Sequence, residues 1–419
     1  MKKNWEIKKL GDVCEFRRGL TYSKNDEVEN SSNAVLRSNN IDLITNRLDL
    51  SEIKYISNKI KIDETKKVKR DSLLICTANG SKAHLGKVAL IDDDYDFAFG
   101  GFMGLLIPSE SVYPRFFYYA LISENYKKFI KSLSDGANIN NLKFQDLSKF
   151  EIPIPPLEEQ KRIVKILDEK FAQLETVKTN AQNNLQNAKD LFQSEFVNIF
   201  NKANTIRMIT VETVCSSIVD CPHSTPKWIT NGKLCLRTTN FKPNQIDLST
   251  KYYVSDETYN ERVLRLKPQP GDIVFSREGG ILGIACMIPN GIYPCLGQRM
   301  MLLRPRKETD NRFLMYYLNS PMIEKIIKSK ILGAAAPHIN VADVKSFPIP
   351  EFPLPEQKRI VEELDTLSEK VKALCAIYEK QIADCEELKK SLLAKAFEGN
   401  IQRHELKQAY LQKAFEGEL

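Results

Sequence analysis

Short apolar runs, separated by residues that favour turns, recur in two stretches of this chain. Examples are the segments DSLLICT, KVALIDD, FMGLLIP, GDIVFS and MMLLRP. Runs of this length, bounded by Gly, Asp and Pro, predict short β-strands. Helical patterns follow at about residues 114–131 and 312–330. Each stretch therefore predicts a mixed α+β domain of about 150 residues, which is an ordinary domain size.

A different pattern follows each stretch and predicts a long α-helix. Each helix begins after a proline-rich stop, IPIPP or PIPEFPLP, because proline fits at a helix start but not inside a helix. Glu158, Glu159 and Glu356 fall in the first turns, where acidic side chains complement the helix dipole. Apolar residues then recur at steps of three or four, as in a coiled-coil seam. They are Ile163, Leu167, Phe171, Leu174, Val177, Ala181, Leu185, Ala188, Phe192, Phe196 and Ile199 in the first helix, and Ile360, Leu364, Leu367, Val371, Leu374, Tyr378, Cys385, Leu388 and Leu392 in the second.

The apolar stripe on each long helix needs a partner. A helix over residues 157–200 is about 66 Å long, and its stripe must be buried against another surface. The second helix carries a matching stripe, so we expect the two helices to lie antiparallel with one domain at each end. Two alternatives remain: each helix packs on its own domain, or it pairs with another chain.

The two halves of the chain repeat one another. PLEEQKRIV starts at Pro156 and PLPEQKRIV at Pro353, 197 positions later. The same offset pairs FFYYAL with FLMYYL, and LGKVALI with LGIACMI. Further upstream an offset of 200 pairs Arg37 with Arg237. A repeat held over most of the chain indicates an internal duplication.

Composition narrows the class of protein without identifying it. The 419 residues are 42% hydrophobic, which is enough for more than one core. The 61 Lys and Arg exceed the 54 Asp and Glu, an excess that permits a phosphate-rich partner and equally fits solvated surface. Nine Cys without a C-x-x-C pair, and only four His, make a zinc site unexpected. Because neither a signal segment nor an apolar run of membrane-spanning length is present, we expect a cytoplasmic protein with free thiols.

The motifs of common enzyme centres are missing from the sequence. It contains no Asn-Pro-Pro-aromatic tetrapeptide for amino-group methylation, no GxxxxGK(S/T) phosphate loop and no G-x-S-x-G nucleophile elbow. His84, His223 and His338 fit surface or hydrogen-bonding histidines better than a general base or a metal ligand. We therefore predict no catalytic residue and no metal site in this chain.

Taken together, the duplicated domain, the proline stops and the helix starts give a sequence that resembles the specificity subunits of type I restriction–modification systems. The resemblance rests on WEIKKLGDV at 5–13, IPIPPLEEQKRIV at 152–164, the second helix start at 348–361 and LLAKAFEGN near the C-terminal end. It covers essentially residues 1–400, and the order and duplication of the motifs make it specific. The second domain departs from the pattern, because MITVETVCSSIVD replaces the WEIKKLG opening. Its boundary after about Asn204 is therefore open.

The resemblance implies an α+β fold with two target recognition domains joined by two long antiparallel coiled-coil helices, related by an internal pseudo-twofold. Each domain would read one half of a split sequence in double-stranded DNA. The helices would set the gap and bind two modification (methyltransferase) subunits carrying S-adenosylmethionine. Restriction subunits using ATP and Mg would join to cleave unmodified DNA, while this chain would be non-catalytic and without a cofactor. The boundaries would be 1–154 and 204–352 for the domains, 155–203 for the central helix, and 353–419 for the C-terminal helix and tail.

Candidate DNA-contacting residues fall in loops that differ between the two copies. In the major groove Arg pairs with guanine, and Asn or Gln with adenine. The first candidates lie in LRSNN and in LRTTN and are Arg37, Asn39, Asn40, Arg237, Thr238, Thr239 and Asn240. A strand edge followed by an Asx turn explains the same residues equally well.

Further loops supply the remaining candidates. The turn after the next strand, TANGSKAH or SREGG, offers Thr77, Asn79, Lys82, His84, Ser276 and Arg277. The opening loops and the GQRM segment offer Arg17, Arg18, His223, Thr225, Lys227, Gln298 and Arg299. The GANINN and GAAAPHIN loops add Asn138, Asn140 and Asn340. Differences between the copies suit two domains that read different half-sites, and they also suit simple drift of loop sequences.

Two other functions stay open from the sequence. A stand-alone methyltransferase or nuclease is one alternative, and the missing motifs oppose it. A coiled-coil scaffold that does not bind DNA is the other alternative, and salt-sensitive binding to duplex DNA would exclude it.

Overall fold

The computed structural model describes residues 4–135, 141–201, 207–331 and 337–399. The chain divides into two compact units: unit 1 comprises Met1–Gln182 and Glu379–Leu419, and unit 2 comprises Asn183–Tyr378. Asn138, Asn140 and the tail after residue 399 lie outside the described residues, and so does the predicted boundary near Asn204. Each unit contains one globular domain and one half of each of the two long helices.

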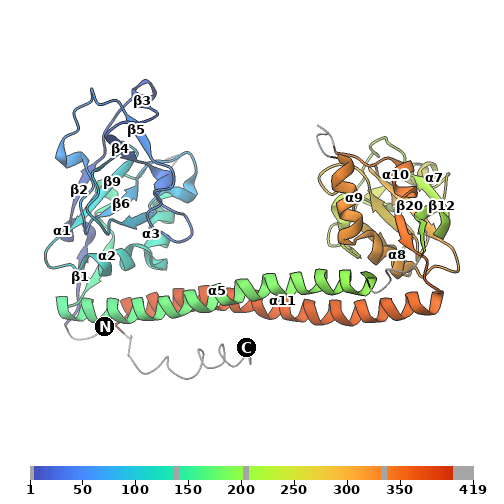
Figure 1. Cartoon of the computed structure of the whole chain (residues 1–419). Helices are drawn as coiled ribbons and strands as arrows, with labels where there is room; N and C mark the ends of the chain where they lie inside the picture. Colours follow the sequence, from blue (N-terminus) through green and yellow to red (C-terminus); the bar gives the residue numbers. More distant parts are fainter. Residues whose placement is uncertain (1–3, 136–140, 202–206, 332–336, 400–419) are drawn as a thin grey trace. The chain divides into compact units, whose positions relative to one another are not determined.

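The domain of unit 1 is mixed α+β, as the sequence predicts (Figure 1). Its elements in chain order are β1 (Glu6–Lys9), α1 (Leu10–Val13), β2 (Cys14–Arg18), β3 (Glu27–Val28), β4 (Asn33–Leu36), β5 (Lys54–Ile56), β6 (Leu73–Cys76), β7 (Val88–Leu90), β8 (Phe97–Phe99), β9 (Met103–Pro108), α2 (Pro114–Leu121), α3 (Glu124–Asp135), α4 (Phe144–Leu147) and β10 (Glu151–Ile154). The described part of the domain holds two four-stranded sheets, with the orders β2-β9-β6-β7 and β3-β5-β4-β8.

The strand β6 shows how the apolar runs build two cores. Side chains alternate between the faces of a strand. Leu73 and Ile75 therefore join the core that contains the helices, and Leu74 and Cys76 join the core beneath the second sheet. Because both faces of the strand are buried, its sequence is a continuous apolar run and not an alternating one.

The domain of unit 2 repeats this plan. Its elements are β11 (Met208–Thr210), α6 (Val211–Val214), β12 (Cys215–Asp220), β13 (Lys233–Leu236), β14 (Phe241–Lys242), β15 (Gln245–Ile246), β16 (Tyr253–Val254), α7 (Asp256–Arg262), β17 (Ile273–Ser276), β18 (Ala285–Met287), β19 (Cys295–Leu296), β20 (Met300–Pro305), α8 (Asn311–Leu318), α9 (Pro321–Ile331), α10 (Val341–Lys345) and β21 (Pro348–Pro350). The sheet β12-β20-β17-β18 corresponds to β2-β9-β6-β7. The parallel pair β13–β19 likewise corresponds to β4–β8.

Each domain is closed by its own first and last strands. β1 pairs antiparallel with β10, and β11 pairs antiparallel with β21, so that each domain begins and ends next to the start of a long helix. The segment β11–α6–β12 takes the place of β1–α1–β2 although it lacks the WEIKKLG opening. Backbone pairing to the last strand therefore preserves the element where the side-chain motif is absent.

The two predicted helical pieces are each divided into two helices. α2 ends near Ser123, whose Oγ donates to the Ala120 carbonyl (2.7 Å) and accepts from the Tyr126 N–H (3.3 Å). In the second copy the break falls at Ser320, just before Pro321, which begins α9. A capping serine and a proline at a helix start both favour a new helix over a continued one.

The long helices α5 (Leu157–Asn201) and α11 (Leu354–Phe397) lie antiparallel in each unit (Figure 1). In unit 1 the start of α5 shares a core with the end of α11, including Leu167 and Leu392. In unit 2 the end of α5 shares a core with the start of α11, including Phe196 and Leu364. These cores also contain residues of the adjacent domain, so the apolar stripe packs both on its own domain and on the other helix.

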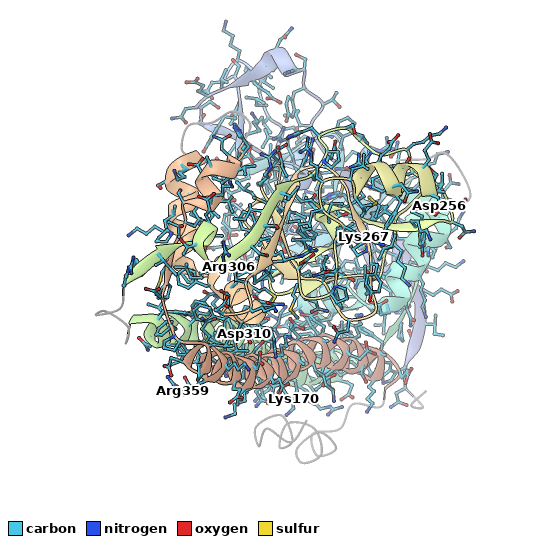
Figure 2. The ribbon with its side chains drawn as sticks, turned by 90° about the vertical axis from the view of Figure 1, so that its right-hand side faces the viewer. Lys170, Asp256, Lys267, Arg306, Asp310 and Arg359 are labelled. Atoms are coloured by element: carbon cyan, nitrogen blue, oxygen red, sulfur yellow. The ribbon has the colours of Figure 1, made fainter. Side chains whose placement is uncertain are left out.

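In unit 2 a side chain of the long helix α11 bonds the backbone of the domain. Asp310, just before α8, lies beside α11 (Figure 2), and its N–H donates to Oε1 of Gln357 at 2.8 Å. Among the described residues, no helix combines the length and the apolar character needed to cross a membrane.

Candidate nucleic-acid interface

The loops that carry the predicted DNA-contacting residues come together in unit 1. The Gly100 N–H donates to the Leu36 carbonyl (2.9 Å), and the Leu20 N–H donates to the Phe99 carbonyl (2.7 Å). Asn79 Nδ2 donates to Ser38 Oγ (3.0 Å), which joins the turn after β6 to the turn after β4. The loops after β2, β4, β6 and β8 therefore form one continuous surface.

The turns at Asn40 and Asn240 are built identically and explain the repeated asparagine. The Arg37 N–H donates to Asn40 Oδ1 (2.8 Å), while Asn40 Nδ2 donates to the carbonyls of Asp49 (2.8 Å) and Glu52 (2.9 Å). Asn240 makes the corresponding bonds to Arg237, Asp247 and Thr250. Both asparagines are buried. Their amides are saturated by backbone groups, and this is the Asx-turn alternative that the sequence left open.

Arg37 faces an open hollow of about 790 Å³ in unit 1. Its guanidinium lies 3.9 Å from the Glu27 carboxylate, and its buried Nε has no hydrogen-bond partner among the described residues. Tyr22 and Asn39 line the same hollow, and Asn39 is exposed. Burial raises the pKa of the Tyr22 hydroxyl, which keeps this group a neutral hydrogen-bond donor and acceptor.

In unit 2 the loops are organised around the buried side chain of Arg277. Its guanidinium donates two hydrogen bonds to Asp220, from Nε (2.8 Å) and from Nη2 (2.9 Å). Nη2 also lies 3.2 Å from His223 Nε2, and Nη1 donates to the Ile339 carbonyl. Bidentate Arg–carboxylate pairs fix geometry strongly. Arg277 therefore holds the loop after β12, the turn after β17 and the segment before α10 together.

An exposed rim surrounds this buried centre. Thr225 Oγ1 donates to Gln298 Oε1 (3.0 Å), which connects the opening loop to the GQRM segment. Lys227 and Arg299 are exposed close to these two residues in the sequence, and Thr239 is exposed in the turn after β13. Arg299 has a positive φ of 70°. This conformation is rare for a residue with a side chain. It places Arg299 at the tip of the turn before β20.

Arg237 is held between two aromatic rings that sequence reasoning missed. Its Cζ lies 5.2 Å from the centroid of Trp228 and 4.6 Å from that of Tyr252. Cation–π attraction acts between the guanidinium charge and the ring faces, and it requires none of the guanidinium N–H donors. Trp228 is one of only two tryptophans in the chain, and this rarity was the one signal that pointed to it.

The remaining predicted residues have mixed environments. Arg17 Nε donates to Glu15 Oε1 (2.7 Å), and Arg18 lies over the Phe144 ring. Lys82 is exposed, and Thr238 is half-buried. Thr77 and Ser276 are buried, with hydroxyls that bond backbone groups. Burial lowers the pKa of the His84 imidazole from its ordinary value. Asn340 is the residue just before α10.

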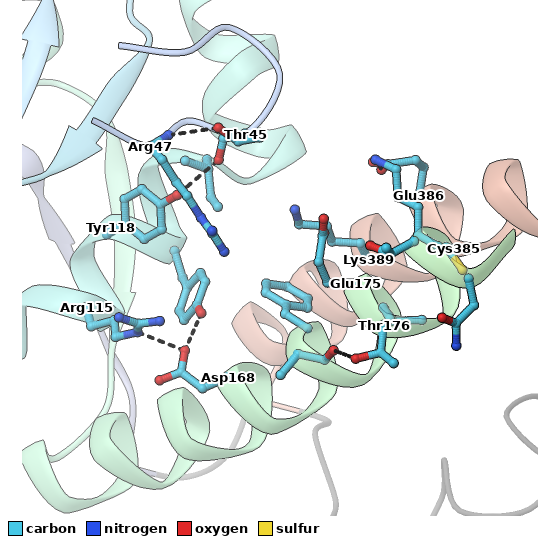
Figure 3. Close-up of a pocket in the computed structure, with 18 residues that line it drawn as sticks. Thr45, Arg47, Arg115, Tyr118, Asp168, Glu175, Thr176, Cys385, Glu386 and Lys389 are labelled. Carbon is cyan, nitrogen blue, oxygen red and sulfur yellow. Dashed lines mark hydrogen bonds and ion pairs between the residues drawn. The ribbon is translucent and has the colours of Figure 1, made fainter. Parts of the chain in front are cut away.

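Matching polar contacts attach each domain to its long helix. In unit 1 Arg115 Nε donates to Asp168 Oδ1 (2.8 Å), and the Tyr119 hydroxyl donates to the same oxygen (Figure 3). Unit 2 repeats this arrangement with Arg312, Tyr316 and Asp365. These contacts hold the loop surface in a fixed orientation on the helix within each unit. Within the described ranges, no group of three or more His, Cys, Asp or Glu is arranged to hold a metal ion.

Comparisons with known proteins agree on one family. The model described as "Type I restriction modification DNA specificity domain" matches residues 2–187 and 230–380. The type I restriction enzyme EcoKI specificity subunit of Escherichia coli (strain K12) is 26% identical over 425 residues, covering 95% of this chain and 89% of the relative. The putative type I restriction enzyme MjaX specificity subunit of Methanocaldococcus jannaschii is 24% identical, covering 95% of this chain and 94% of the relative.

Solved structures share the fold. A chain from a structure concerned with complex assembly and conformational transition of the type I R-M system has a TM-score of 0.75 at 21% identity, covering 96% of this chain and 99% of that chain. The HsdS subunit from Thermoanaerobacter tengcongensis has a TM-score of 0.58, also at 21% identity, covering 96% and 98%. At these identities the likeness supports the architecture of two domains with long helices.

Proposed function

We propose, because the chain belongs to the type I restriction–modification DNA specificity family, that each of its two target recognition domains reads one half of a bipartite target in double-stranded DNA. Members of this family are the non-catalytic, specificity-giving component of their systems. The observation that carries the proposal is the repeated loop surface. The same scaffold gathers the same loops in both units, while the exposed side chains on those loops differ.

The exposed and half-buried members of the loop surface are assigned to DNA contact. Arginine, asparagine and glutamine side chains read base edges, and lysine and hydroxyl groups position the protein on phosphates. In unit 1 the assigned residues are Arg17, Arg18, Arg37, Asn39, Asn79, Lys82 and His84. In unit 2 they are His223, Thr225, Lys227, Arg237, Thr238, Thr239, Gln298 and Arg299.

The buried members are assigned to loop support. The polar side-chain atoms of these residues form hydrogen bonds with backbone groups or with Asp220. The residues are Asn40, Asn240, Thr77, Ser276 and Arg277. Without these hydrogen bonds the side chains that contact DNA would lose their fixed positions. A binding site whose side chains are displaced by about 1 Å recognises its ligand poorly. We expect their substitution to impair DNA reading through stability and not through a lost base contact.

The two long helices are assigned to spacing and assembly. They set the unread gap between the half-sites and bind two modification subunits that carry S-adenosylmethionine. Restriction subunits that use ATP and Mg join this assembly to cleave unmodified DNA. The proposed limits are 1–154 and 204–352 for the domains, 155–203 for the central helix and 353–419 for the C-terminal helix and tail.

Salt-dependent binding to duplex DNA tests the proposal. Affinity should fall linearly on a double-logarithmic plot against salt, because phosphate contacts release counterions. Lys227→Ala should make the slope shallower by about one unit, whereas Lys358→Ala, which removes an exposed charge from α11, should leave it unchanged. Salt-independent or undetectable binding would favour the scaffold alternative, and methyl transfer by the chain alone would favour the enzyme alternative.

A further inference from the structure

Phe102 is an exposed aromatic residue on a rigid turn of the loop surface in unit 1. The residue is 74% exposed. Its carbonyl accepts hydrogen bonds from the Thr77 N–H (3.0 Å), the Ala78 N–H (3.1 Å) and the Thr77 hydroxyl (3.0 Å). The Met103 N–H also donates to the Gly100 carbonyl (2.8 Å), which closes the turn. The backbone is therefore fixed while the ring points away from both cores.

The duplication places Arg299 at the equivalent position in unit 2. Phe102 precedes Met103 at the start of β9, and Arg299 precedes Met300 at the start of β20. The carbonyls of both residues accept a 3.0 Å hydrogen bond from the turn that follows the central strand, from the Thr77 N–H and the Arg277 N–H. One turn thus presents an apolar ring in one unit and a guanidinium in the other.

A phenylalanine ring that stays exposed contributes little hydrophobic stabilisation to the fold, because little of its apolar surface leaves water. Phe102 nevertheless sits in the middle of polar neighbours: Arg37, Asn39 and Tyr22 line the same hollow. A single exposed apolar side chain is ordinary on a protein surface; what distinguishes Phe102 is its place on a fixed backbone turn, beside a hollow lined by hydrogen-bonding groups. In the major groove the apolar feature that such a ring meets is the methyl group of thymine.

We propose that Phe102 is a specificity-determining residue of unit 1, which contacts the C5-methyl group of a thymine in that unit's half-site. This inference rests on the proposed function. Arg299 fills the equivalent position in unit 2 with a donor suited to guanine. The two units would therefore favour different bases at the same point of their footprints.

The test uses the full chain with its modification subunits. The target is first mapped by detecting methylated bases, and duplexes are then made in which each thymine of the unit 1 half-site is replaced in turn by uracil, which lacks only the methyl group. For the unaltered chain, one replacement should weaken binding on the order of tenfold. Phe102→Ala should bind the thymine duplex about as weakly and should be insensitive to that replacement. Phe102→Leu, which keeps an apolar group, should retain part of the sensitivity.

Ile7→Ala is the control, because Ile7 is an exposed apolar residue of unit 1 (54%) that lies on β1, outside the loop surface. It should leave both affinities unchanged. The inference is overturned if Phe102→Ala keeps the affinity and the uracil sensitivity of the unaltered chain, or if the unit 1 half-site contains no thymine. If the unaltered chain directs no methylation to a bipartite target, the proposed function itself fails, and the two failures are thus distinguishable.

Discussion

Asp168 on α5 binds Arg115 on α2, with Arg115 Nε donating a 2.8 Å hydrogen bond to Asp168 Oδ1. The duplication preserves this relationship as Asp365 and Arg312. Because Asp168 also accepts from the Tyr119 hydroxyl, one carboxylate fastens two points of the recognition domain to the long helix. The pair thus helps to fix the orientation of the loop surface of unit 1 relative to the part of α5 in that unit.

Replacement of Asp168 by Asn should loosen this attachment. The side chains of Arg115 and Asp168 are 46% and 35% exposed, so solvent screens the pair, and the loss of unfolding free energy should be about 1 kcal/mol. Urea denaturation measures this loss. Asp365→Asn should give a similar loss in the other unit, and a destabilisation well above this range in either variant would contradict a screened surface attachment.

Gln160 should matter more for stability, because it is buried where α5 begins. It accepts from the Tyr113 N–H (2.8 Å) and donates to the carbonyls of Ser111 (2.9 Å) and Pro155 (2.8 Å). Gln160→Ala leaves these groups buried without partners and should cost about 2–4 kcal/mol of unfolding free energy. The neighbouring exposed Lys161→Ala should cost less than about 0.5 kcal/mol. Equal effects of the two variants would show that the buried glutamine has no special role.

The stability of unit 1 should fall in mild acid, partly through His84. Burial lowers the pKa of its imidazole in the folded state below the ordinary value of 6.5. As the pH drops below 6.5, the imidazole of the unfolded chain takes up a proton before that of the folded chain does. The contribution of His84 to the unfolding free energy is therefore full above pH 6.5, and it decreases as the pH falls toward the folded-state pKa. Melting temperatures at pH 7.5 and 5.5 should therefore differ less for His84→Gln than for the unaltered chain. An identical difference in the two proteins would rule out this contribution.

The unread gap in the DNA target should follow the length of the long helices. Insertion of one heptad after Gln182 in α5 and a matching heptad after Tyr378 in α11, where the two units divide, preserves the apolar seam. Each heptad adds about 10.5 Å of helix, or about three base pairs of DNA. Mapping of methylated bases should show both half-sites unchanged and the gap wider. An unchanged gap would reject the spacing role of the helices.

The regular parts of the fold were predictable because they follow local patterns. The runs around Leu73 and Ile273 are strands, and the stripes through Leu167 and Leu364 are buried seams, since burial of apolar side chains imposes those periodicities. The break at Ser123 was missed because a capping hydroxyl resembles any other polar residue within a helical pattern.

The polar architecture was harder to predict, since its partners are far apart in the sequence. Gln160 and Asp168 both recur 197 positions later, but a repeated polar residue does not reveal whether it anchors a domain or contacts a ligand. The same ambiguity applies to Asn40, whose partners Asp49 and Glu52 only the structure identifies. The role of Trp228 beside Arg237 likewise depends on loops that no local pattern brings together.

The claim that each unit reads its own half of the target is tested most directly by Arg237→Ala. Methylated bases are mapped in DNA from cells that express the unaltered chain or the variant together with the modification subunits. We predict a bipartite target in which the variant relaxes or changes one half and leaves the other half and the gap intact. A contiguous target, or a change spread over both halves, would contradict the account.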